Sequence, residues 1–208
     1  MSSRSHQDAI WQALPEGLEP KGFALRRDFL LAAVEAGDRV LDVGCGEGAF
    51  AAELRSAGAE VLAADVAAEP LARADRAHPG LPTLMIEPDG PWDLGDSAFD
   101  VVWAGEVIEH VADTAAWLSE VRRVLRSGGS LIVTTPDTGP LALIWMALSR
   151  RAFSERMDPR SDHLRFYNGR TLSALLRDFG FGEVSVRRAG GLPGLRRHLL
   201  VTATRSRY

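Results

Sequence analysis

Glu106, Glu109 and His110 are spaced so that one helical turn would place all three side chains on the same face. Two carboxylates and an imidazole gathered in this way form a repulsive cluster unless a cation or a bound substrate compensates it. His163 follows a polar stretch, residues 154–162, and would fold over the same cleft if that stretch acts as a lid. Imidazole and carboxylate groups suit proton transfer. The candidate catalytic residues are therefore His110, His163 and Glu106.

A second segment that could bind a ligand reads Val40-Leu-Asp-Val-Gly-Cys-Gly-Glu-Gly48, a short apolar strand running into a glycine turn. Glycine lets backbone take positive φ or come close to a ligand, and open α/β sheets bind ligands at the carboxyl ends of their strands. Asp42 and Glu47 would repel a pyrophosphate, and the glycine spacing is not that of a dinucleotide loop. The segment suits a cationic ligand without phosphate, such as S-adenosylmethionine, held by Asp42, Gly44 and Gly46.

Later positions complete the expected cofactor site. Asp65 ends a second strand, 21 residues after Gly44, where an acidic residue can accept hydrogen bonds from both ribose hydroxyls. Val66 would then lie against the adenine face. Asp89, after a third strand, is placed to accept from the adenine amine, with Glu87 as a second choice. The glycine turn alone could be a generic tight turn, and the carboxylates Asp42 and Asp65 argue against that alternative.

The elements that must position these residues alternate between strand-like and helix-like patterns. Such alternation implies right-handed crossovers and a mainly parallel, doubly wound α/β sheet covered on both faces. The last two strands, joined by a glycine-rich turn at residues 190–194, indicate an antiparallel edge. Strands are predicted at 39–43, 60–64, 83–86, 99–103, 130–135, 183–188 and 198–204, and helices at 23–36, 49–57, 71–77, 115–125, 140–152 and 170–179.

Taken together, these motifs resemble the class I S-adenosylmethionine-dependent methyltransferases, in particular a large group of small enzymes. The resemblance covers about residues 23–204 and implies a seven-stranded sheet with an antiparallel last strand in a single domain, residues 1–208. Residues 1–22 would be an N-terminal extension and about 137–165 a lid or insertion. The sequence departs from the group at Asp89-Gly-Pro-Trp-Asp-Leu, where Asp-Leu-Pro-Phe is usual. The signatures are the glycine segment, Phe99-Asp-Val-Val, Glu106-Val-Ile-Glu-His-Val, Leu125-Arg-Ser-Gly-Gly-Ser-Leu-Ile-Val-Thr-Thr-Pro and Asp178-Phe-Gly-Phe.

Within that superfamily, the acidic and histidine residues are also similar to those of metal-assisted O-methyltransferases, including small-RNA 2′-O-methyltransferases and some quinone-pathway enzymes. The resemblance implies that Glu106, Glu109, His110 and His163 hold a divalent ion such as Mg²⁺. Such an ion would lower the pKa of an acceptor hydroxyl and orient its oxygen. Two alternatives stay open: His110 or His163 acts as a general base without metal, or both histidines are structural.

Composition agrees with one ordinary globular domain. The 208 residues are 46% hydrophobic and 25% charged, which suffices for a sizeable core and excludes disordered and collagen-like classes. The single cysteine, Cys45, cannot form an internal disulfide, and no apolar run reaches the length of a membrane span. The first residues lack an apolar signal core. We therefore expect a cytoplasmic protein without a membrane span.

Charge is distributed unevenly along the chain. Residues 1–100 carry 8 Lys+Arg and 18 Asp+Glu, whereas residues 101–208 carry 16 and 10. A basic second half suits an anionic substrate, nucleic acid or a membrane surface, or is simply a solvated face. The apolar residues 141–148 either pack internally or shape an apolar acceptor pocket.

The sequence favours O-methylation of a small-molecule or lipid-linked acceptor, with N- or C-methylation as the alternative. From other classes, an RNA-binding modifier would need a binding module that the chain lacks, so no nucleic acid is expected as partner. A cofactor-binding pseudo-enzyme is disfavoured because Asp42, Gly44, Gly46 and Asp65 are intact.

Overall fold

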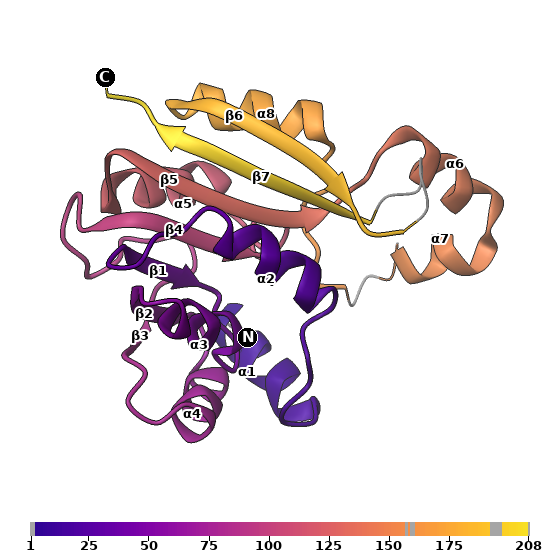
Figure 1. Ribbon diagram of the computed structural model, residues 1–208. Coiled ribbons are helices and arrows are strands. Elements are labelled where there is room, and N and C mark those ends of the chain that lie inside the picture. Colours follow the sequence, from indigo (N-terminus) through magenta and orange to yellow (C-terminus); the bar gives the residue numbers. More distant parts are fainter. Residues whose placement is uncertain (1–2, 157, 159–160, 192–196, 208) are drawn as a thin grey trace.

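The protein is described by a computed structural model covering residues 3–156, 158, 161–191 and 197–207. Within these residues, seven strands form one sheet in the order β3-β2-β1-β4-β5-β7-β6 (Figure 1). Neighbouring strands from β3 to β5 are parallel, while β7 runs antiparallel to both β5 and β6. The predicted seven-stranded sheet with an antiparallel last strand is confirmed. The strands are β1 Arg39–Val43, β2 Glu60–Asp65, β3 Thr83–Met85, β4 Phe99–Gly105, β5 Leu125–Pro136, β6 Phe181–Ala189 and β7 His198–Arg205.

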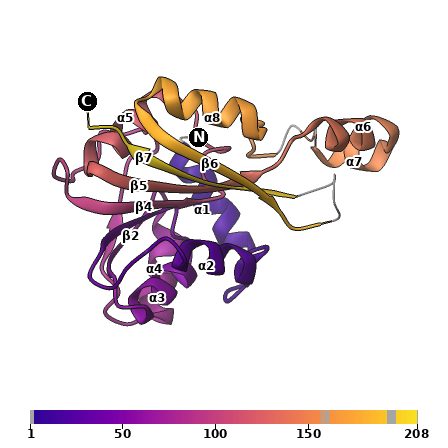
Figure 2. The same ribbon diagram turned by 45° about the horizontal axis from the view of Figure 1, so that its top comes forward.

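Helices cover both faces of the sheet (Figure 2). Strand β1 shows why, because its successive side chains point to opposite faces and both faces are apolar. Val40 packs with Phe50 and Leu54 on one face, while Leu41 packs with Trp117 on the other. The first face carries α2 Phe23–Leu31, α3 Ala49–Ser56 and α4 Ala68–Ala77, and the second carries α5 Thr114–Val124 and α8 Gly169–Asp178.

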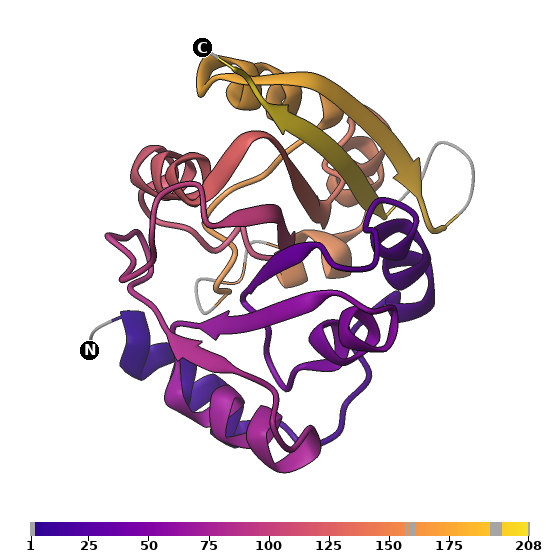
Figure 3. The same ribbon diagram turned by 60° about the vertical axis from the view of Figure 1, so that its left-hand side comes forward.

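Two helical segments differ from the expected pattern. Helix α1, Ser3–Ala13, was not predicted, and it lies alongside α4 (Figure 3). Asp8 fixes it there, since its carboxylate accepts hydrogen bonds from the N–H groups of Ala68 and Glu69 at 2.9 and 3.1 Å. The helix expected over 140–152 is divided at Ser149 into α6 Pro140–Leu148 and α7 Arg150–Arg156.

Parts of two expected loops, residues 157, 159 and 160 and residues 192–194, lie outside the described residues. The division of the chain into an N-terminal extension, a core and a lid stays a prediction. None of the helices in the described ranges has both the length and the apolar character needed to traverse a bilayer.

Candidate functional site

The glycine turn after β1 is held by backbone hydrogen bonds and is packed against neighbouring side chains that leave no room for a Cβ. The N–H groups of Gly44 and Cys45 both donate to the carbonyl of Ala64, at 2.8 and 3.0 Å, which ties the turn to β2. Gly44 has φ +71°, and a Cβ there would overlap Cγ2 of Val107. The turn therefore packs directly against residues 106–110, the segment that carries the candidate catalytic groups.

Asp65 and Asp42 lie buried beside this turn. The Asp65 carboxylate accepts hydrogen bonds from the N–H groups of Gly46 and Ala67, each at 3.1 Å, so it shapes the loop. Oδ2 of Asp42 has no hydrogen-bond partner among the described residues. Burial and the nearby charge of Asp65 raise the pKa of Asp42 to about 7. Glu47, which was expected to favour a cationic ligand, pairs with Arg73 at 3.0 Å and also lines the larger of the two cavities described below.

Two cavities meet at the turn. The smaller, about 280 Å³, is lined by Asp65 and Val66, by Ile86 just after β3, and by Trp11 of α1 and Trp117 of α5. The larger, about 1250 Å³, exceeds the range of about 300–1,000 Å³ usual for a single small-ligand pocket. Gly44, Glu106 and His110 line both cavities. The arrangement suits a ligand that extends from one cavity into the other, next to a second molecule.

Two residues predicted to contact the cofactor line neither cavity. Asp42 lies beneath the loop, and Asp89 turns toward the start of α5, where its carboxylate accepts from the N–H of Asp113 at 3.1 Å. The smaller cavity is bordered at this point by Ile86 and Pro88 instead. Contact of Asp42 and Asp89 with a cofactor stays a prediction.

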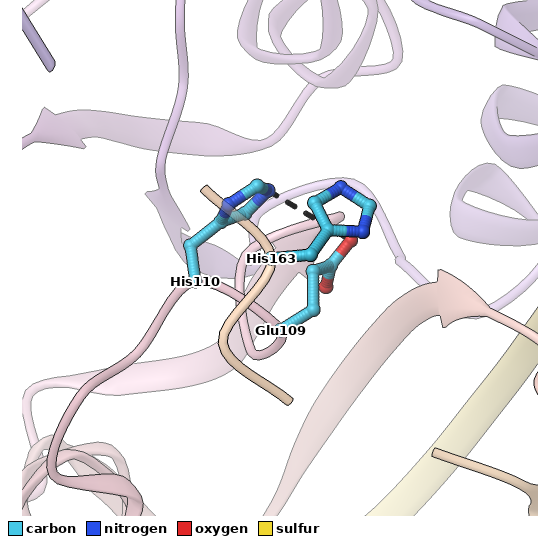
Figure 4. A group of neighbouring side chains, drawn as sticks. All are labelled: Glu109, His110 and His163. Atoms are coloured by element: carbon cyan, nitrogen blue, oxygen red, sulfur yellow. Dashed lines mark ion pairs between the residues drawn. The ribbon is translucent and has the colours of Figure 1, made fainter. Parts of the chain in front are cut away.

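Glu109, His110 and His163 lie close together (Figure 4), and all three line the larger cavity. One carboxylate oxygen and one ring nitrogen from each histidine lie within 4.8 Å of one another. The backbone explains how residues far apart in sequence meet there. The N–H groups of Leu164 and Arg165 donate to the carbonyl of Glu109 at 2.8 and 3.0 Å, which brings His163 beside His110. The two imidazole rings stand 4.7 Å apart between centroids.

Glu106 lies outside this cluster of three. The helical turn that would align it does not form, because Glu106 itself takes φ +59° and only residues 108–110 make a turn. Its carboxylate lies 3.4 Å from Nδ1 of His198 at the start of β7. Burial opposes its ionisation, but His198 and Arg26 together hold the pKa of Glu106 below its ordinary value. The structure thus unites three of the four residues expected to share an ion and places Glu106 in a separate pair.

Within this cluster, Glu109 is a buried carboxyl group that is only partly hydrogen-bonded. The side chain is 1% exposed, and its Oε2 accepts from the Thr135 hydroxyl at 2.9 Å. Oε1 has no hydrogen-bond partner among the described residues. Burial, followed by the nearby charge of Glu106, raises the pKa of Glu109 to about 8. This carboxyl can exchange a proton near neutral pH or give its unpaired oxygen to a cation.

Sequence reasoning missed Arg26, Trp11 and His198, which all line the larger cavity. The Arg26 guanidinium is buried 4.7 Å from the centroid of the Phe50 ring and donates to the Thr134 hydroxyl at 3.0 Å. Trp11 of α1 reaches to 2.9 Å from the position of a Cβ on Gly46, so α1 covers the glycine loop. Each of the three lies in a segment without a recognisable motif. The only signal in the sequence is a single charged, imidazole or aromatic residue in that segment.

The strand order, the glycine turn after β1 and the carboxylate at the end of β2 define the Rossmann-like fold of class I S-adenosylmethionine-dependent methyltransferases. The methyltransferase domain family matches residues 18–186, and the chain belongs to this family. The predicted class and fold are thereby confirmed.

Curated relatives carry a more specific name. The chain is 35% identical over 164 residues to a ubiquinone biosynthesis O-methyltransferase of Ruegeria sp., covering 76% of this chain and 66% of the relative. It is 34% identical over 146 residues to the protein of that name from Sodalis glossinidius, covering 67% and 58%. The chain thus spans less than two thirds of the length of these relatives.

Solved structures share the fold. Phosphoethanolamine N-methyltransferase 2 of Haemonchus contortus, in complex with phosphomonomethylethanolamine and S-adenosylhomocysteine, superposes with a TM-score of 0.76 at 18% identity, over 100% of this chain and 61% of that one. An S-adenosylmethionine-dependent methyltransferase of Methanosarcina mazei gives 0.66 at 22% identity, over 85% and 96%. At these identities the likeness concerns the fold alone.

Proposed function

We propose that this domain transfers the methyl group of S-adenosylmethionine to a hydroxyl oxygen of a small or lipid-linked acceptor. The observation that carries the proposal is the meeting of two cavities at Gly44, Glu106 and His110, with Glu109 and His163 lining the larger cavity beside His110. The smaller cavity, beside Asp65 and Val66, suits the adenosine. The larger cavity has room for the methionine part and the acceptor. The name shared by the curated relatives supports oxygen as the methylated atom.

The transfer is an in-line displacement. The acceptor oxygen forms a bond to the methyl carbon, the carbon–sulfur bond breaks, and the electron pair stays on sulfur in neutral S-adenosylhomocysteine. The hydroxyl proton leaves to a base. Most of the rate comes from holding the oxygen, carbon and sulfur in line, which the rigid turn at Gly44 favours.

His110 is the best placed base among the described residues. Its Nδ1 lies 3.0 Å from the carbonyl oxygen of Asp162. A carbonyl can only accept, so Nδ1 carries the proton in the neutral ring and Nε2 is left as an acceptor. Nε2 lies 4.0 Å from Oε1 of Glu109, so a hydroxyl between these two groups could contact both. His163 borders the same space.

The same three residues also fit a divalent ion. Oε1 of Glu109 is buried without a described partner, and one carboxylate with two imidazoles is a common donor set for borderline divalent metals. Glu109, His110 and His163 would hold the ion, with Glu106 engaged by His198. A bound ion would lower the pKa of an acceptor hydroxyl.

The proposal is tested by incubating the protein with isotope-labelled S-adenosylmethionine and hydroxylated aromatic acceptors, each with and without an apolar chain. We expect an O-methyl product, identified by its mass and by the NMR chemical shift of the new methyl group, which differs for methyl on oxygen, nitrogen and carbon. A product methylated on nitrogen or carbon would contradict the assignment of oxygen. The absence of transfer to every acceptor, with the cofactor bound, would contradict this acceptor class.

A second experiment distinguishes proton removal by His110 from a reaction assisted by a bound metal ion. His110→Ala should lower the transfer rate at least about a hundredfold if His110 removes the proton. A strong chelator should leave the rate unchanged in that case and abolish it if an ion is required. Full activity of both His110→Ala and His163→Ala would exclude these histidines as general base and as metal ligands. The rate would then come from the positioning of acceptor and methyl group.

A further inference from the structure

Helix α6 exposes a continuous apolar stripe. Leu141, Ile144, Trp145 and Leu148 follow one another at the spacing that places side chains on one face of a helix. They are 53, 55, 57 and 82% exposed, and α6 contains no buried residue. An exposed apolar patch of this kind marks an interaction site rather than a core-facing helix.

The stripe stands on a projection of the molecule. Helices α6 and α7 form a hairpin that extends away from the sheet beyond the end of β5 (Figures 1 and 2). Phe153 of α7 is 51% exposed on the same hairpin. Pro136, the last residue of β5 before the hairpin, lines the larger cavity. The hairpin therefore begins at the rim of the space assigned to the acceptor.

The hairpin carries a net positive charge. Helices α6 and α7 together contain Arg150, Arg151 and Arg156 and one acidic residue, Glu155. Arg150 and Arg151 are exposed at the start of α7 and are separated from Leu148 by Ser149 alone. Apolar side chains that include tryptophan, with arginines beside them, are the combination that inserts at the boundary between anionic headgroups and acyl chains.

We propose that the α6–α7 hairpin docks on an anionic lipid surface, with the α6 stripe in the interface and Arg150 and Arg151 against the headgroups. The charge complementarity argues for anionic lipid as the occupant of this face. Docking in this position would set the rim of the larger cavity near the bilayer, where an acceptor with an apolar chain resides. The inference concerns where the domain binds and goes beyond the methyl transfer proposed above.

Vesicle sedimentation tests the proposal. We expect the full chain to sediment with vesicles of equal parts phosphatidylglycerol and phosphatidylcholine, to bind pure phosphatidylcholine more weakly, and to be released by salt. The double variant Ile144→Asp/Leu148→Asp should lose at least about ten-fold in partition coefficient. Met85→Asp is the matched control, because Met85 is 49% exposed on β3, away from the hairpin. Both variants change exposed positions, and their thermal unfolding should match that of the wild type.

Fluorescence gives a second measurement. Trp92, Trp103 and Trp117 are buried, and the partly exposed Trp11 lies on α1 over the glycine loop. Lipid insertion of the hairpin should therefore shift the emission of Trp145 to shorter wavelength. Trp145→Phe should lose the shift and still sediment with anionic vesicles.

Several results would overturn the proposal. These are no sedimentation of the wild type with anionic vesicles, equal partition of the double variant and the Met85→Asp control, or a wild-type dimer that Leu148→Asp dissociates without lipid. The last result would assign the stripe to a second copy of the chain. Neither S-adenosylmethionine nor acceptor is present in these assays, so their failure is separate from a failure of methyl transfer.

Discussion

Replacing Gly44 by alanine separates the two reasons for glycine at the turn. Gly44 has φ +71°, and Gly80, in a surface turn, has φ +76°. Alanine costs roughly 1–2 kcal/mol in the left-handed region at either position. Only at Gly44 does the new Cβ also overlap a neighbour, Cγ2 of Val107, whereas nothing lies within 4 Å of a Cβ at Gly80. Overpacking of this kind adds about 1–3 kcal/mol.

We therefore expect Gly80→Ala to lower the free energy of unfolding by about 1–2 kcal/mol and Gly44→Ala by about 2–5 kcal/mol. Urea denaturation at fixed pH measures both. Gly44→Ala should also weaken S-adenosylhomocysteine binding in calorimetry, while Gly80→Ala should not. Val107→Ala removes the overlapping methyl group, so the double variant Gly44→Ala/Val107→Ala should recover about 1–3 kcal/mol relative to additivity.

The reasoning is refuted if Gly44→Ala and Gly80→Ala have equal stabilities and equal cofactor affinities. It is also refuted if Val107→Ala gives no recovery. In either case the turn would tolerate a side chain, and its closeness to the 106–110 segment would not explain the glycine.

Asp42→Asn should change the pH dependence of stability: burial and Asp65 raise the pKa of Asp42 from 3.8 to about 7, so the folded state keeps a proton that the unfolded state releases above about pH 4. Asp42 should therefore lower wild-type stability by up to about 4 kcal/mol between about pH 4 and 7. Glu109, whose pKa is also raised, lowers stability in the same direction in both proteins, so denaturation is compared at each pH, and the stability of the variant relative to the wild type should grow by that amount over this range. Trp11→Ala should weaken S-adenosylhomocysteine binding about ten-fold in calorimetry, because the indole covers the loop at Gly46, and unchanged affinity would show that α1 is no part of the site. RNA should not bind appreciably at physiological salt in a filter-binding assay, whereas a tight complex that weakens steeply with salt would favour the RNA-modifying alternative.

The sheet and the glycine turn could be predicted from the sequence because their signals are local. Val40 and Leu41 face opposite sides of β1 and are both buried, which matches the expectation of a strand covered on both faces. The positive φ of Gly44 could likewise be expected from the sequence, because glycine adopts positive φ more readily than any other residue. Helix boundaries were less exact: Ser149, where α6 ends, gives no glycine or proline signal.

The candidate site was predicted less completely because its contacts span the chain. The spacing of Glu106, Glu109 and His110 indicated a shared helical face, yet Glu106 pairs with His198, 92 residues later. Local periodicity holds no information about such a pair. Arg26 enters the site in the same way, through a hydrogen bond to Thr134, 108 residues away.

The central claim is that the turn at Gly44 and the carboxylate of Asp65 form an S-adenosylmethionine site, and calorimetric titration with S-adenosylhomocysteine tests it most directly. The account predicts binding in the micromolar range, weaker binding of NADH, and a loss of about 1–3 kcal/mol in Asp65→Ala, whose carboxylate holds the N–H groups of Gly46 and Ala67. Preference for NADH, or equal affinity of Asp65→Ala and the wild type for S-adenosylhomocysteine, would contradict it.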